Sequence, residues 1–337
     1  MTDSKSSLKS TSSLDRIREW LALVRLSLAD AGNRDFSDLQ ASYLQHDQAA
    51  QKVLGRSLTA CKVIEIGYGA RPNRLIWFFG QGVDITGIDL DQPILRGTPG
   101  EFLRVYRKNG WERALKTVTR WFINERQLRR ALLADLSRQR GKTVQLAPQR
   151  LVVGNAASED FWARHHGANY IFSEDVFEHI PPGALQRILP IMAASMDPNG
   201  VAYVKPMVYT GICGGHHIEW YPHTLNQQRN RLTEPWEHLR KNRHPANTYL
   251  NKLSLADYRK LFSMHFDILQ ETCVRPNLGS QFMTPEIRQD LIQYPDEELF
   301  SNGVVFLLRP RRNSPGSAGN HGPYLDMPSD PARQQVL

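Results

Sequence analysis

The order of apolar and polar positions divides this 337-residue chain into strand-like and helix-like segments. From residue 61 onward, short apolar runs alternate with longer helical or loop segments. That alternation is typical of a parallel sheet covered by helices. The predicted strands are Lys62–Ile66, Asp84–Asp89, Arg150–Val153, Tyr170–Phe172, Val201–Lys205, Phe266–Glu271 and Val304–Leu308. We therefore predict an α/β fold with a doubly wound sheet of seven strands.

Helical periodicity is found before the sheet and inside it. An amphipathic helix with basic margins is predicted from Leu14 to about Ala31, and a second helix from about Asp38 to Leu54. Residues 98–147 carry apolar side chains at near-helical spacing, which predicts a helical insertion. Residues 211–251 are rich in His, Asn, Trp and Arg with weak periodicity, which predicts a long excursion over the substrate side of the sheet.

The two ends of the chain differ in composition from the rest. Residues 1–13 are rich in Ser and Lys, and residues 311–337 are rich in Pro, Gly, Ser and Asn, so we expect two disordered tails. Between them we expect N-terminal helices over residues 14–59 and one α/β domain over residues 60–310. A composition of 41% hydrophobic and 23% charged residues fits a packed globular core.

The net charge of +8 is concentrated in one part of the chain. Between Arg96 and Arg150 there are fourteen Lys or Arg residues against four Asp or Glu. Three interpretations stay open: a solvated helical face, which we favour, a lid that attracts an acidic substrate, or a surface for anionic lipid or polymer. A nucleic-acid substrate is disfavoured, because neither an Asn/Asp-Pro-Pro-aromatic signature nor an accessory binding motif is present.

Cysteine spacing and hydropathy bear on location. The three cysteines, Cys61, Cys213 and Cys273, form no C-x-x-C pair, so we expect reduced thiols rather than a zinc or redox site. No stretch approaches the roughly 18 apolar residues of a membrane span, and no leader-like segment is found. We expect a cytoplasmic protein, with peripheral membrane contact through the basic segment left open.

A glycine turn and an acidic residue indicate the cofactor class. The first predicted strand ends in Gly67-Tyr68-Gly69, where paired glycines let the backbone turn sharply and approach a ligand. Asp89 ends the second strand, twenty residues after Gly69, where a carboxylate can accept hydrogen bonds from ribose hydroxyls. Together they predict an adenosine-containing cofactor, either NAD or S-adenosylmethionine.

In these motifs the chain resembles the class I S-adenosylmethionine-dependent methyltransferases, in the branch that acts on small molecules, lipids and sugars. The resemblance covers about residues 60–205 in the correct order, at Glu65-Ile66-Gly67-Tyr68-Gly69, Gly87-Ile88-Asp89-Leu90-Asp91, Val152-Val153-Gly154-Asn155-Ala156, Ser173-Glu174-Asp175-Val176-Phe177-Glu178-His179 and Met196-Asp197-Pro198-Asn199-Gly200. It implies a Rossmann-like fold and S-adenosylmethionine as cofactor. It also implies the cofactor-binding residues Glu65, Gly67, Tyr68, Gly69, Asp89, Leu90, Asn155, Ala156, Ser173 and Glu174.

Two positions depart from the family pattern. Arg71 stands where a third glycine is frequent, and Asn155 stands where an aspartate is frequent. Asn155 retains a carbonyl oxygen that can accept a hydrogen bond from an adenine amine. Arg71 either pairs with the methionine carboxylate of the cofactor or points to solvent, and both alternatives stay open.

Histidines are the candidates for the chemistry at the methyl acceptor. A hydroxyl acceptor needs a base, and imidazole titrates near neutrality, so we select His179, His216 and His217. For His179, local packing at a helix start is the competing interpretation. No spacing typical of a metal site is found around His216, His217, Glu219 and His223, so we expect no metal.

The predicted reaction is O-methylation of a small molecule or glycan; whether the acceptor is anionic and what the oligomeric state is are both left open. An NAD-dependent oxidoreductase is the main alternative, but Pro72 stands where G-x-G-x-x-G requires its third glycine. A binding protein that retains the fold without catalysis is the second alternative, because fold does not fix function.

Overall fold

The computed structural model describes residues 35–226, 231–246 and 248–311. Its centre is a seven-stranded sheet in the order β3-β2-β1-β4-β5-β7-β6. The strands are β1 (Lys62–Ile66), β2 (Asp84–Asp89), β3 (Leu151–Val153), β4 (Ala168–Glu174), β5 (Met196–Lys205), β6 (Phe266–Cys273) and β7 (Val304–Pro310). Strands β1 to β5 pair in parallel, whereas β7 runs antiparallel to both β5 and β6. The predicted Rossmann-like sheet is confirmed.

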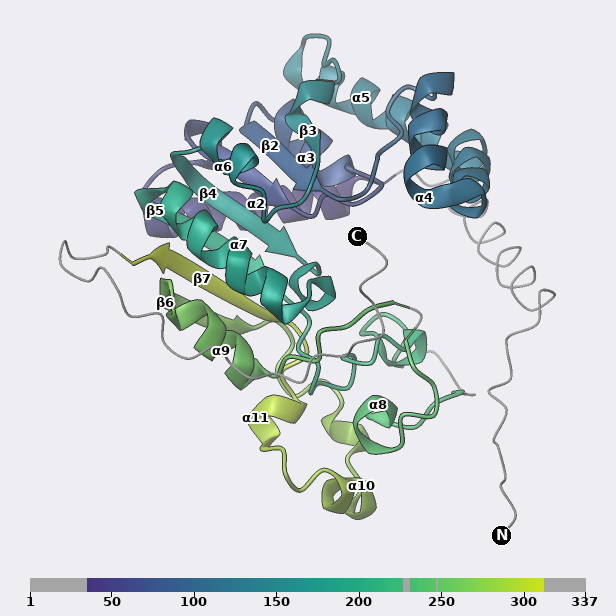
Figure 1. Cartoon of the computed structure of the whole chain (residues 1–337), viewed down its shortest axis with the longest axis vertical. Helices are drawn as coiled ribbons and strands as arrows, with labels where there is room; N and C mark the ends of the chain where they lie inside the picture. The colour runs from purple at the N-terminus through teal and green to yellow at the C-terminus, as the bar shows by residue number, and fades with distance from the viewer. Residues whose placement is uncertain (1–34, 227–230, 247, 312–337) are drawn as a thin grey trace.

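Helices cover both faces of this sheet (Figure 1). They are α2 (Ser37–Leu54), α3 (Asn73–Gly80), α4 (Pro99–Arg120), α5 (Arg126–Arg140), α6 (Glu159–Arg164), α7 (Pro182–Ser195), α8 (Glu237–Arg240), α9 (Leu255–Ser263), α10 (Pro285–Asp290) and α11 (Asp296–Leu299). One core cluster joins the sheet to α6, α7 and α9, and a second joins it to α2, α3 and α5. The central strands are apolar on both sides because both sides are covered.

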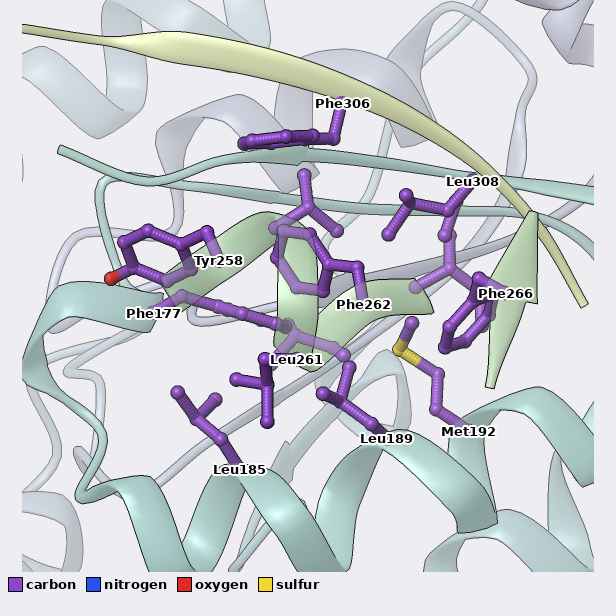
Figure 2. Close-up of a cluster of buried hydrophobic side chains, with 14 of the residues drawn as sticks. Phe177, Leu185, Leu189, Met192, Tyr258, Leu261, Phe262, Phe266, Phe306 and Leu308 are labelled. Carbon is purple, nitrogen blue, oxygen red and sulfur yellow. The ribbon is translucent and has the colours of Figure 1, made fainter. Parts of the chain in front are cut away.

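The core under α7 and α9 is closely packed (Figure 2). Leu185, Leu189 and Met192 lie four or three residues apart on one side of α7, and all three are fully buried. They face Phe262 of α9, whose ring lies edge-on to Phe306 of β7 at 5.0 Å between centroids. Helix α9 begins with a capping box in which Ser254 and Asp257 exchange hydrogen bonds.

The predicted insertion is helical, and half of it belongs to the core. Helix α4 starts with a Thr98–Glu101 capping box and kinks at Gly110, where φ is 79°. A π-helical turn at Trp121–Glu125 leads into α5. Leu136 of α5 is fully buried against α3, where a Cβ added to Gly80 would lie 2.5 Å from it.

The predicted excursion after β5 contains short elements rather than long helices: a 3₁₀ turn at Ile218–Trp220 and α8. Its buried tryptophans, Trp220 and Trp236, share a cluster with Leu291 and Leu299 from the segment that carries α10 and α11. Figure 1 shows α8, α10 and α11 together at one end of the molecule. The excursion is therefore half of a small lobe, and its partner segment at residues 278–300 was not predicted.

The second predicted N-terminal helix is confirmed as α2, which packs on α3 and β5. The predicted helix at 14–31 and the two predicted tails, apart from Arg311, lie outside the described residues. Among the described helices, none has the length and apolar character needed to cross a membrane.

Candidate active site

The glycine turn after β1 is closely packed at Gly67 and has free space at Gly69. Both Gly67 and Gly69 have positive φ, 85° and 68°, which favours glycine. The Gly67 amide donates a hydrogen bond to the Ile88 carbonyl, and a Cβ at Gly67 would lie 2.3 Å from a Val176 methyl. A Cβ at Gly69 would meet no atom within 4 Å. The turn is thus packed at Gly67 and leaves free space beside Gly69.

Asp89 fixes that turn from the end of β2. Its Oδ2 accepts a hydrogen bond from the Gly69 amide at 2.7 Å, and its Oδ1 accepts one from the Asp91 amide at 2.6 Å. Burial raises the pKa of Asp89, and the two amide hydrogen bonds oppose that shift. Leu90, the next residue, is 54% exposed, which places an apolar side chain in solvent beside the acid. The structure therefore brings Gly69, Asp89 and Leu90 together.

Tyr68 connects the glycine turn to β2 and β3, and the loop after β3 lies nearby. The Tyr68 hydroxyl donates to the Val152 carbonyl at 3.0 Å, and the ring lies so close to Gly87 that a Cβ there would be 2.6 Å away. Asn155 is exposed, and its Oδ1 accepts the Ala157 amide at 2.8 Å. Ala156 packs against the core.

The side chains at the end of β4 turn into the protein. Ser173 is buried and donates to the Ile66 carbonyl at 2.9 Å, which ties β4 to the end of β1. Glu174 accepts a hydrogen bond from His46 Nε2 of α2 at 2.6 Å and another from Lys205 Nζ at 2.8 Å. Sequence reasoning missed these partners, because His46 is 128 positions away from Glu174.

Glu174 belongs to a buried ion network beneath the glycine turn. Arg74 joins it to Glu65: Arg74 Nε lies 2.9 Å from Glu65 Oε1, and Arg74 Nη1 lies 3.3 Å from Glu174 Oε2. Burial opposes ionisation of Glu174, but the His46 hydrogen bond and the charges of Arg74 and Lys205 hold its pKa well below the usual range. Burial lowers the pKa of His46, and because the ionised Glu174 carboxylate can only accept, Nε2 is the donor in the contact between them. Burial raises the pKa of Glu65.

Arg71 does not stand alone in solvent: its Nε lies 2.6 Å from Glu125 Oε1, in the π-helical turn of the insertion. Arg120 Nε lies 2.5 Å from the same oxygen. The basic insertion is therefore attached by an ion pair to the segment that follows the glycine turn.

A second group of polar side chains follows β4 and β5. Glu178, His179 and His216 each offer one ligand atom, and these atoms all lie within 4.8 Å of one another. Glu178 is 3% exposed, and burial, with the nearby charge of Asp175, raises its pKa to about 8 against the opposing effect of two backbone amides. Burial lowers the pKa of His216 to about 4, so its imidazole is neutral. We call these three residues the Glu–His–His cluster.

Two of the sequence-selected histidines, His179 and His216, are in this cluster, and their ring centroids are 5.0 Å apart. His217 instead lies beside His238, with the ring centroids 6.3 Å apart. Glu219 is bonded to Thr233, and His223 stacks on Tyr221, so neither is in the cluster. Glu178 is a candidate that sequence reasoning did not select, although it precedes His179 directly.

Comparison with known proteins gives similarity at the level of structure only. No protein-family model and no curated protein matches the sequence. A protein from Pyrococcus horikoshii matches at a TM-score of 0.42 and 10% identity, over 84% of this chain and 95% of that one. The 1,6-didemethyltoxoflavin-N1-methyltransferase of Burkholderia thailandensis, with bound S-adenosylhomocysteine, matches at 0.38 and 13%, over 91% and 94%. Magnesium protoporphyrin IX methyltransferase of Synechocystis matches at 0.38 and 12%, over 88% and 98%.

Proposed function

We propose that this chain is an S-adenosylmethionine-dependent methyltransferase. The observation that carries the proposal is the Asp89 carboxylate bonded to the Gly69 amide at 2.7 Å, beside a glycine turn with open space at Gly69. In open α/β sheets, ligands bind outside the carboxyl ends of the strands where the strand order reverses. Here the order reverses between β1 and β4, and the turn directly follows β1.

The strand order favours this cofactor over NAD. A dinucleotide-binding sheet has the order 3-2-1-4-5-6. In this chain β7 is instead inserted between β5 and β6 and runs antiparallel to both, which differs from the parallel sheet that the sequence pattern predicted. Pro72 begins α3 and removes the third glycine of a dinucleotide-binding turn.

The residues present fit an adenosine-containing cofactor. Each Asp89 oxygen accepts one amide hydrogen bond and has a further lone pair for a ribose hydroxyl. Exposed Leu90 offers apolar surface to an adenine, and exposed Asn155 offers an amide. Glu65, Ser173 and Glu174 support the turn through their buried contacts rather than through exposed side chains. Bound S-adenosylmethionine supplies an electrophilic methyl group on a sulfonium.

The remaining task of the protein is to orient the acceptor and accept its proton. We assign the acceptor side to His179 and His216, which follow β4 and β5. Their imidazole lone pairs suit either proton abstraction or coordination of a cation. Together with the sequence resemblance, this supports O-methylation of a small molecule or glycan.

Calorimetry with the full chain tests the cofactor. We expect S-adenosylmethionine to bind and NAD not to bind. Asp89→Asn weakens binding at least about tenfold, because hydrogen bonds to an ionised group contribute more than neutral ones. Asp84→Asn is the matched control at the opposite end of β2, where Asp84 pairs with Arg150 on the surface. Binding of NAD without S-adenosylmethionine contradicts the proposal.

Methyl transfer from labelled cofactor to fractionated small molecules and glycans tests catalysis. A labelled product that disappears in Asp89→Asn supports the enzyme. Cofactor binding with no labelled product in any fraction supports a non-catalytic binding protein instead.

A further inference from the structure

The Glu–His–His cluster combines three potential metal ligands from two separate segments. Glu178 and His179 lie in the 3₁₀ turn after β4, and His216 lies in the loop after β5. Their ligand atoms are within 4.8 Å of one another, a separation that one ion can span. The two imidazole planes are inclined by 79°, so they do not stack on each other.

Several of these atoms are buried without a partner. In the part of the chain that the structure describes, three buried polar atoms of the cluster complete no hydrogen bond: Nε2 of His216 and both carboxylate oxygens of Glu178, which two backbone amides approach. Lys205, the nearby cation, is bonded to Glu174 and Asp175 instead. A buried carboxyl group without a hydrogen-bond partner is unfavourable, and its ionised form is favoured only when a cation binds it. The cluster thus presents acceptor atoms that the protein itself does not satisfy.

The orientation of His179 suits a ligand. Its Nδ1 lies 3.0 Å from the Tyr249 carbonyl, so Nδ1 carries the hydrogen and Nε2 carries the lone pair. Metal-binding histidines commonly use their second nitrogen in this way, which fixes the ring and its tautomer.

The backbone around His216 is equally constrained. His216 has φ of 55°, in the left-handed region that non-glycine residues rarely adopt. Gly214 and Gly215 allow the loop to pack closely, since a Cβ at Gly214 would lie 2.0 Å from the Tyr209 carbonyl oxygen. Such strained positions persist where the surrounding structure imposes them, and they occur frequently at functional sites.

We propose that Glu178, His179 and His216 bind one divalent transition-metal ion of the zinc or manganese class. Two imidazoles and one carboxylate form a ligand set that suits such ions and leaves coordination positions open, whereas magnesium and calcium prefer oxygen ligands alone. An acceptor oxygen bound at an open position would lose its proton more easily. This last, catalytic role rests on the proposed methyltransferase function, but metal binding does not.

The test is binding of the metal alone to the full chain. After dialysis against a chelator, the protein is titrated calorimetrically with Zn²⁺, Mn²⁺ and Mg²⁺, and bound metal is counted by elemental analysis. We expect one Zn²⁺ or Mn²⁺ per chain and no comparable Mg²⁺ binding. His179→Gln and His216→Asn each weaken binding more than about 100-fold, because even outer-shell changes weaken metal sites 10- to 100-fold. Asparagine is chosen for its tolerance of positive φ.

Two variants keep the result interpretable. His223→Gln removes a neighbouring exposed histidine that is outside the cluster and should bind metal as the original chain does. Glu178→Gln keeps the size of the side chain but replaces the carboxylate by a neutral amide, so it should fold, as judged by its circular dichroism spectrum, and lose metal binding. Absence of Zn²⁺ and Mn²⁺ binding in the folded protein overturns the proposal, as does binding retained in His179→Gln and His216→Asn. Asp89→Asn keeps metal binding, so a failure of the cofactor proposal is distinguishable.

Discussion

Arg74→Met probes the buried ion network beneath the glycine turn. In the described part of the chain, Arg74 is the residue that hydrogen-bonds the 1% exposed Glu65, at 2.9 Å. Glu174 would keep His46 and Lys205, but Glu65 would keep no cation. Removing one partner of a buried pair destabilises a protein by about 3–5 kcal/mol. Because the Arg74 side chain is 22% exposed and water can reach its place, we expect the lower end, about 3 kcal/mol.

Urea unfolding followed by tryptophan fluorescence measures this loss at pH 7.5 for Arg74→Met, Glu65→Gln and the double variant. The double variant removes both members of the pair, so it should be more stable than Arg74→Met by at least about 1 kcal/mol. Equal stability of the single Arg74→Met and the double variant would show that the unpaired Glu65 is not the cause.

The pH dependence gives an independent check. Burial already raises the pKa of Glu65, and loss of the guanidinium raises it further. A carboxyl group whose pKa is higher in the folded state stabilises that state at low pH and loses this contribution as the pH rises. The deficit of Arg74→Met relative to the original chain should therefore grow between pH 5 and pH 8. A deficit that is constant or shrinks over that range refutes the reasoning.

Three further stability measurements follow from the same structure. Gly67→Ala should lower the free energy of unfolding by about 3 kcal/mol through positive φ and overlap with Val176, whereas Gly69→Ala, with positive φ alone, should lower it by about 1 kcal/mol. Equal losses in the two variants would contradict the packing described at Gly67. Leu136→Ala should lower the free energy of unfolding by about 3 kcal/mol, whereas Leu115→Ala, at a residue that is 59% exposed, should lower it by less than about 0.5 kcal/mol. Urea midpoints measure both, and the reverse order would mean that α5 does not pack in the core. Burial lowers the pKa of His46, so the original chain should lose stability as the pH falls below the unfolded pKa of about 6.5. His46→Gln should reduce the difference in unfolding free energy between pH 7.5 and pH 5.5 by up to about 1.4 kcal/mol, and an unchanged difference would mean that His46 titrates normally in the fold.

The sheet was predictable because each strand has a local signature. A short apolar run such as Lys62–Ile66, bounded by a loop and a glycine turn, can be predicted as a strand without knowledge of the strands beside it. The pairing of Gly69 with Asp89 was also predictable, because adjacent parallel strands end at the same edge of the sheet. These features depend on short-range pattern and on one general rule of topology.

The directions of the polar side chains were not predictable. Ser173 and Glu174 were expected at a cofactor, but their partners come from distant elements, and no local pattern encodes the His46 contact. Glu178 was likewise missed as a partner of His216, because the two are joined by the placement of separate loops. Their roles toward a cofactor or acceptor stay predictions.

The antiparallel strand β7 has a consequence for how the chain is made. Strands β1 to β5 can pair in the order in which they leave the ribosome, but β5 then has an open edge, and its neighbour in the sheet begins only at Val304. In the described structure β6 pairs with β7, so it too must wait for the same segment. An open strand edge is a template for pairing with other chains. Until the segment Val304–Pro310 has been made, the edge of β5 therefore remains open to other chains, and β6 joins the sheet only through that same segment.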